Sequence, residues 1–110
     1  MKKAIALLGA LLLVSCGEVP NTGADGYKFG TKEYDLETVQ VSKVYFKSVS
    51  QFQKSAKDRG IENWDSVAAY SVLQPGKDSC TIYMVDPETA YEPEYAGHEL
   101  FHCFHGRWHP

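Results

Sequence analysis

All four histidines of this 110-residue chain lie between residues 98 and 109, and this cluster constrains the local fold more than any other feature. Two of them, His98 and His102, flank the sequence Glu-Leu-Phe in an H-E-x-x-H pattern. Side chains four residues apart share one face of an α-helix, so a helix here directs both imidazoles at one zinc ion. Glu99 lies about 100° further round such a helix. It is placed to act as a general base towards water, whose pKa a zinc ion lowers to about 7.

A zinc ion that catalyses hydrolysis needs a third protein ligand, and the sequence offers more than one. His109 is the preferred candidate, because a left-handed glycine at position 106 ends the helix and lets the chain turn back. His105 shares the face of His98, but it lies about 10 Å further along an unbroken helix, which gives poor tetrahedral geometry. An upstream acidic residue such as Asp86 is the remaining alternative.

The first 15 residues have the pattern of a secretory signal peptide, with Lys2 and Lys3 preceding an apolar run over residues 4–14. The run is too short for a bilayer span, which needs about 20 residues. The sequence Leu-Val-Ser-Cys that ends at Cys16 resembles the lipobox of bacterial lipoproteins. This resemblance implies cleavage before Cys16, acylation of Cys16, and a membrane anchor in the cell envelope. Gly17 implies the outer membrane, with the protein facing the periplasm.

The stretch after the signal peptide is rich in Gly, Pro, Asn and Thr. It predicts a lipidated cysteine with a flexible tether over residues 16–30, and a folded domain over residues 31–110. The chain carries 11 Lys and Arg against 14 Asp and Glu, for a net charge of -3. This balance argues against a nucleic-acid partner.

Cys80 and Cys103 remain once Cys16 is assigned to the anchor. In an oxidising periplasm, a disulfide between them is the simplest expectation. Free thiols, or a ligand role for Cys103, are the alternatives.

Hydrophobic alternation and turn residues predict the order strand, helix, strand, strand, helix. The expected elements are a strand over 39–49, a helix over 51–58 capped by Ser50, two strands over 67–73 and 80–85 joined by a turn, and a helix over 93–104 that begins at Pro93. This order predicts an α+β domain, with two helices and a small open antiparallel or mixed sheet.

The stretch from about residue 67 to 109 resembles a small version of the zincin metallopeptidases. In that family the motif helix follows an edge strand that binds substrate in extended form. The spacing after the motif is similar to the H-E-x-x-H-x-x-G-x-x-H pattern of metzincins, although here the glycine and the last histidine come one residue later. The resemblance implies zinc, peptidase activity, and a substrate lying along the strand of residues 80–85.

Tyr91, Tyr95 and Arg107 are candidates for stabilising an oxyanion, although packing for the tyrosines and solvation for the arginine are the simpler roles. The features together predict a membrane-anchored zinc hydrolase that cleaves a peptide or amide bond in a peptide or cell-wall substrate. The alternative is a non-catalytic lipoprotein that binds zinc or interacts within the cell envelope. Four histidines would also close a tetrahedral site and leave no position for water. The sequence leaves the oligomeric state open.

Overall fold

The computed structural model describes residues 21–74, 76 and 78–110. The predicted signal peptide, the lipobox and Cys16 lie outside the described residues. Within the described part, no helix has the length and apolar character needed to cross a membrane.

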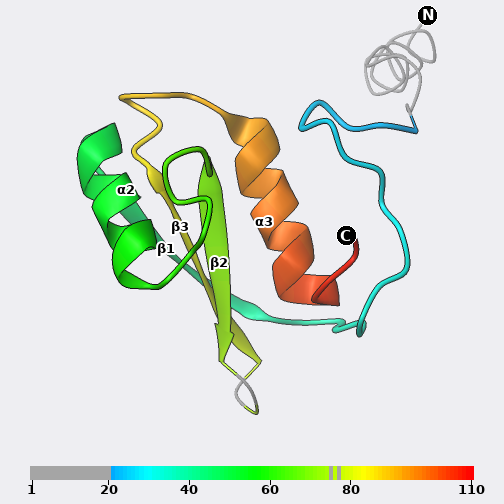
Figure 1. Cartoon of the computed structure of the whole chain (residues 1–110). Coiled ribbons are helices and arrows are strands. Elements are labelled where there is room, and N and C mark those ends of the chain that lie inside the picture. Colours follow the sequence, from blue (N-terminus) through cyan, green and yellow to red (C-terminus); the bar gives the residue numbers. More distant parts are fainter. Residues whose placement is uncertain (1–20, 75, 77) are drawn as a thin grey trace, which may run out of the picture.

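The described chain forms an α+β fold with two helices and a three-stranded mixed sheet, as the sequence predicts (Figure 1). The elements follow in the order β1 (Gln40–Phe46), α2 (Val49–Asp58), β2 (Ala69–Gln74), β3 (Ser79–Val85) and α3 (Pro93–His105). Pro93 stands at the start of α3, where its missing N–H costs no helical hydrogen bond.

The start of α2 differs from the prediction. Ser48, not Ser50, is the N-cap: its backbone is extended and its hydroxyl accepts a hydrogen bond from the N–H of Gln51 at 3.2 Å. Ser50 lies inside the helix. An N-cap side chain accepts a hydrogen bond from a backbone N–H two or three residues ahead, and Ser48 fills this role.

The strand order is β1-β3-β2, with β1 parallel and β2 antiparallel to β3. β3 is therefore the central strand, and the prediction that residues 80–85 form the substrate-binding edge strand is wrong. After β1 the chain passes through α2 to the β2–β3 hairpin. β1 pairs with the side of β3 that lies opposite β2. The edge strand that packs against α3 is β2.

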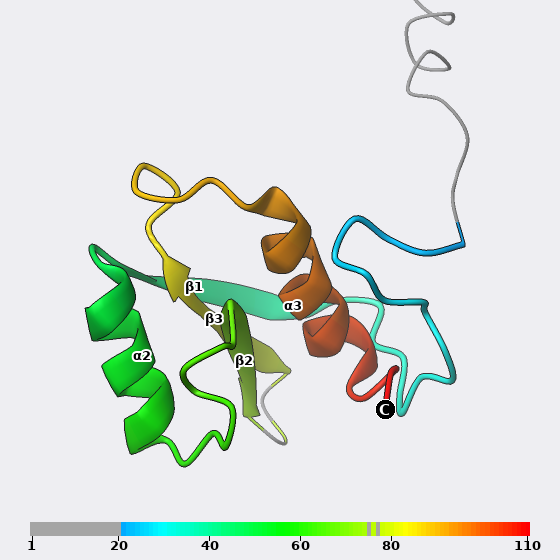
Figure 2. The same cartoon turned by 45° about the horizontal axis from the view of Figure 1, so that its top comes forward.

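The two helices cover opposite faces of the sheet (Figures 1 and 2). The core between the sheet and α3 consists of Ala69, Cys80, Ile82, Met84 and Cys103. The core between the sheet and α2 consists of Phe52, Ala56, Tyr70 and Val85. β3 contributes to both cores because successive side chains of a strand point to opposite faces. Burial of α3 on the sheet fixes the helix that carries the H-E-x-x-H motif.

Residues 21–38, which we call the N-terminal arm, run beside the end of α3. The N–H groups of Glu33 and Tyr34 donate to the carbonyl of His105, and the N–H of Leu36 donates to that of Phe104. These bonds satisfy carbonyls that the end of a helix leaves without intrahelical partners. The N–H of Gly30 donates to the carbonyl of Trp108 at 2.9 Å. The second half of the stretch expected to be a tether thus lies against the folded domain.

Candidate metal centre

Three histidine side chains converge at the end of α3. The Nε2 atoms of His98 and His102 lie 3.1 Å apart, and the Nε2 of His109 lies 3.0 Å from each of them. A zinc ion bound tetrahedrally at about 2.0–2.1 Å needs ligand nitrogens about 3.3 Å apart. The triangle is therefore close to the size that such an ion requires, and it contains the three residues favoured from the sequence.

The hydrogen bonds at the opposite ring nitrogens set the tautomer of each histidine. Each Nδ1 lies beside an oxygen that only accepts: Asp25 Oδ2 at 2.7 Å for His98, Gly106 O at 2.7 Å for His102, and Pro110 O at 3.0 Å for His109. Each Nδ1 must therefore carry a proton, so each neutral ring presents a lone pair at Nε2. Three lone pairs facing one another at this separation repel, and a metal cation among them removes the repulsion. The donor set thus fits a metal that binds imidazole.

Gly106 brings His109 to the other two histidines. Its φ of 67° lies in the left-handed region, as predicted, and its N–H donates to the carbonyl of His102 at 2.8 Å. A Cβ at this position would lie 2.5 Å from Cε2 of the Tyr34 ring and 2.6 Å from Glu33 Oε1, so the arm leaves little room for a side chain. The buried ring of Trp108 stacks on His102 at a centroid distance of 5.1 Å and anchors the turn.

Glu99 is buried, with 7% of its surface exposed, and lines the same groove as the three histidines. Burial raises its pKa to about 7, although a hydrogen bond from the Ser71 hydroxyl, 2.8 Å from Oε1, acts in the opposite direction. A carboxyl group that gains and loses its proton near neutral pH is suited to general base catalysis. Burial also lowers the pKa of His102; the hydrogen bond to Gly106 opposes this shift, and the neighbouring histidines add to it.

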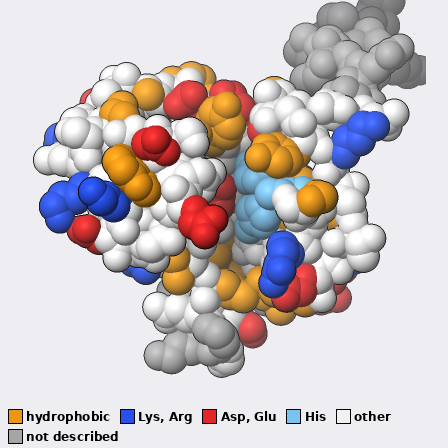
Figure 3. Space-filling view, viewed as in Figure 1, with side chains coloured by type: hydrophobic (Ala, Val, Ile, Leu, Met, Phe, Trp, Pro, Cys, Tyr) orange, Lys and Arg blue, Asp and Glu red, His pale blue; other side chains and the backbone are white. Residues whose placement is uncertain are grey.

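The site opens into a groove of about 760 Å³ between α3 and the edge strand β2. One wall consists of Ala69, Ser71 and Leu73 of β2 with the loop over residues 63–68, and the other wall consists of α3 and the N-terminal arm. Figure 3 shows the histidines in pale blue along one side of this hollow, with acidic side chains in red near them. The groove is open enough for an extended chain to reach the histidines.

The other ligand candidates do not join the cluster. His105 points to the arm, where its buried Nδ1 lies 3.2 Å from Asp35 Oδ1 without hydrogen-bond geometry. Asp86 accepts a hydrogen bond from the N–H of Glu88 at 2.9 Å in the turn after β3. The group of residues that could hold a metal ion, among those that the structure describes, therefore includes neither His105 nor Asp86.

The oxyanion candidates divide into two kinds. Tyr95 and Arg107 line the groove, and Arg107 is exposed there. Tyr91 is 77% exposed and is absent from the described lining of the groove. The placement keeps Tyr95 and Arg107 as candidates and gives Tyr91 no contact with the site.

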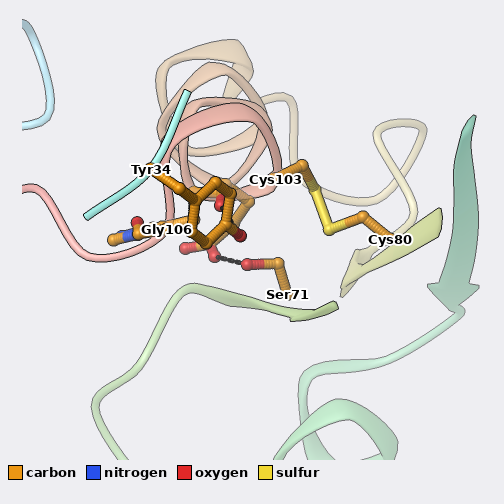
Figure 4. The surroundings of a disulfide bond; sticks show 7 residues. Tyr34, Ser71, Cys80, Cys103 and Gly106 are labelled. Carbon is orange, nitrogen blue, oxygen red and sulfur yellow. Dashed lines mark hydrogen bonds between the residues drawn. A yellow bond between two sulfur atoms is a disulfide. The ribbon is translucent and has the colours of Figure 1, made fainter. Parts of the chain in front are cut away.

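Cys80 and Cys103 form the predicted disulfide, with Cα atoms 5.7 Å apart and both residues buried. The alternatives of free thiols or a Cys103 ligand are wrong, because the sulfur that would ligate is bonded to Cys80. Figure 4 shows the disulfide leaving α3 away from Tyr34 and Gly106. The bond ties the motif helix to the central strand one residue after His102.

Sequence reasoning missed three residues of the site. Asp25 contacts His98, Ser71 contacts Glu99, and the ring of Tyr27 lies 4.7 Å from the His98 ring and 4.3 Å from the His109 ring. Asp25 and Tyr27 fall in the stretch expected to be a tether. The signal that could have found this stretch is the pair Tyr27 and Phe29, since aromatic residues are uncommon in flexible linkers.

No family model, curated protein or solved structure matches this chain.

Proposed function

We propose that this protein is a zinc-dependent hydrolase that cleaves peptide or amide bonds, with His98, His102 and His109 as metal ligands. The observation that carries the proposal is the convergence of three Nε2 lone pairs beside a buried carboxylate in one open groove. The zincin resemblance of the H-E-x-x-H stretch supports it.

Zinc fits this donor set better than the hard cations calcium and magnesium. Neutral imidazole is a good ligand for zinc, whereas calcium and magnesium prefer oxygen. Three histidine ligands would leave a zinc ion accessible to water, as in catalytic rather than structural zinc sites. When bound, zinc lowers the pKa of water towards 7 and polarises the carbonyl oxygen of a substrate.

Glu99 is the general base of the proposed reaction. Its carboxylate accepts a proton from water in the groove and then donates that proton to the departing amine. The Ser71 hydroxyl, 2.8 Å from Oε1, holds the carboxylate in a fixed orientation. Tyr95 and Arg107 are the residues of the groove that can stabilise negative charge on the substrate oxygen.

The substrate lies along β2, because this edge strand forms a wall of the groove. An extended peptide adds to such an edge by main-chain hydrogen bonds. This mode suits flexible or extended chains, including peptides of the cell wall, rather than the surface of a folded protein.

The competing function is a closed zinc-binding site without catalysis, which requires a fourth protein ligand. His105 is the histidine left over; it faces Asp35 in the arm and lies outside the group of three histidines. The structure of the described residues thus favours a site that leaves a position for water.

A metal analysis followed by a cleavage assay tests the proposal. The purified chain should contain about one zinc ion, and His98→Ala and His109→Ala should each lose it. Glu99→Gln should keep the zinc but lower peptide hydrolysis at least ~100-fold, since a positioned general base contributes about 10²–10⁴-fold.

Glu94→Gln is the matched control for that assay, because Glu94 lies in the first turn of the same helix. It should keep both zinc and activity. A wild-type chain that holds no zinc after reconstitution would refute the proposal. Zinc retained without any peptide hydrolysis would favour the non-catalytic zinc-binding lipoprotein.

We also propose that Cys16 carries lipid and anchors the protein in the cell envelope, at the outer membrane facing the periplasm. The support is the lipobox-like sequence over residues 13–16. Cells supplied with labelled palmitate should label the wild-type protein and leave Cys16→Ser unlabelled. Label in both proteins would contradict this anchor.

A further inference from the structure

We infer that Asp25 is a positioning residue for His98, and that the N-terminal arm is therefore a working part of the metal centre. This inference rests on the proposed metal site. It extends that site from the ligands to a carboxylate that lies 73 residues earlier in the chain.

The contact between Asp25 and His98 is short and shielded from solvent. Oδ2 of Asp25 lies 2.7 Å from the Nδ1 of His98, and the two side chains are only 12% and 8% exposed. The other carboxylate oxygen, Oδ1, accepts the N–H of Tyr27 at 3.0 Å. Both oxygens of Asp25 thus have partners, which fixes the orientation of the carboxylate.

The arm that carries Asp25 is docked by several independent contacts. The ring of Tyr27 packs on those of His98 and His109, and the ring of Phe29 stacks on Trp108 at 5.2 Å with an interplanar angle of 21°. At Gly30 the backbone passes so close to Trp108 that a Cβ would lie 2.8 Å from the carbonyl oxygen of that residue. These contacts place Asp25 beside His98.

The three ligands differ in the group that orients them. His102 and His109 donate to backbone oxygens, whereas His98 donates to a carboxylate. A carboxylate partner holds the tautomer and ring orientation that ligation requires, and it makes Nε2 a stronger donor to the metal. Loss of such a partner in other metal sites weakens metal binding about 10–100-fold. Among these three orienting groups, Asp25 supplies the side chain that substitution can remove.

Competition with a chromogenic chelator measures the zinc affinity of the full chain, expressed with its own N-terminal sequence in an oxidising compartment. We expect Asp25→Ala to weaken binding about 10–100-fold, and Asp25→Asn to weaken it less because its amide oxygen still accepts a hydrogen bond. Asp35→Asn is the matched control, since Asp35 contacts the histidine outside the ligand set. It should change the affinity less than about twofold, because Asp35 is half-exposed and contacts none of the three proposed ligands.

The absorption spectrum of the cobalt-loaded protein does not respond to a general loss of stability. The visible absorption bands of the Co²⁺-loaded protein report the geometry and strength of its ligands. These bands should shift in Asp25→Ala and stay unchanged in Asp35→Asn.

Gly30→Val tests the arm while leaving Asp25 in place. Its side chain cannot fit beside the Trp108 carbonyl. We expect the arm to shift at this point and to carry Asp25 away from His98. We expect a loss of zinc affinity similar to that of Asp25→Ala. Circular dichroism identifies any variant that fails to fold, and the isosteric Asp25→Asn then decides the question.

The outcomes separate this inference from the proposed site. If His98→Ala loses zinc but Asp25→Ala, Asp25→Asn and Gly30→Val bind it as the wild type does, Asp25 has no positioning role and the site itself stands. If the wild-type chain binds no zinc, both proposals fail.

Discussion

The Glu99→Gln substitution is expected to stabilise the metal-free protein at alkaline pH. Glu99 is buried, and burial raises its pKa from 4.5 to about 7. The folded state therefore holds the proton more tightly than the unfolded state does. Unfolding becomes easier as the pH rises through this range, because ionisation is cheaper in the unfolded chain. Glutamine has nearly the same shape, still accepts the hydrogen bond from Ser71, and carries no charge at any pH.

The size of the effect follows from the displaced pKa. One pKa unit corresponds to about 1.4 kcal/mol, so above pH 8 the ionised Glu99 lowers the free energy of unfolding by ~3 kcal/mol. At pH 5.5 the same linkage gives only ~1 kcal/mol, because the folded state is still protonated. Glu99→Gln should recover these amounts, so its gain in stability should grow with pH.

Urea denaturation in the presence of a chelator measures both values, at pH 5.5 and pH 8.5, under conditions that keep the disulfide intact. The histidines are the same in both proteins, so their titration largely cancels in the comparison. Glu62→Gln, at an exposed loop position, is the control and should show no such pH-dependent gain. Saturating zinc should reduce the advantage of Glu99→Gln, because a cation nearby stabilises the carboxylate. A gain that is absent, or that is equal at the two pH values, would refute the claim that Glu99 is a buried, ionisable group.

Three further predictions test the rest of the site. His105→Ala should retain zinc while His109→Ala loses it, as metal analysis by mass spectrometry will show; the opposite pattern would move the third ligand to His105. Replacement of Cys80 and Cys103 by serine should lower the free energy of unfolding by ~3 kcal/mol, as measured by urea denaturation. This is the value expected for a disulfide that closes a loop of this length. An unchanged denaturation midpoint would contradict a stabilising role for the disulfide. Gly106→Ala should destabilise the protein by more than ~1 kcal/mol, because it adds a side chain at positive φ and against the arm. It should also weaken zinc binding. Normal stability and normal zinc affinity would show that the turn tolerates a side chain.

The motif helix shows how far local patterns predict the site. The spacing of His98, Glu99 and His102 requires only 3.6 residues per turn to place two imidazoles together and a carboxylate beside them. Gly106 marks the end of the helix because few other residues adopt a positive φ without strain. For the third ligand, the sequence favoured His109 but did not exclude His105. The observed turn brings His109 to the cluster.

The roles of the strands needed the tertiary structure. The sequence predicts the β2–β3 hairpin, since a turn joins two strands that are adjacent in the chain. It does not reveal that β1 pairs with the far side of β3 and makes it the central strand. That pairing made the edge-strand prediction for residues 80–85 wrong and left β2 beside α3 as the wall of the groove.

The sequence by itself determined the elements, the helix that presents the histidines, the glycine that ends it and the two cysteines available to pair. Each depends on the conformational preferences of neighbouring residues or on the small number of cysteines. Only the tertiary structure decided that Asp25 orients His98 and that Ser71 holds Glu99. These contacts join residues 73 and 28 positions apart, so they arise from the packing of the arm and of β2 on α3. Periodicity along the chain carries no information about such packing.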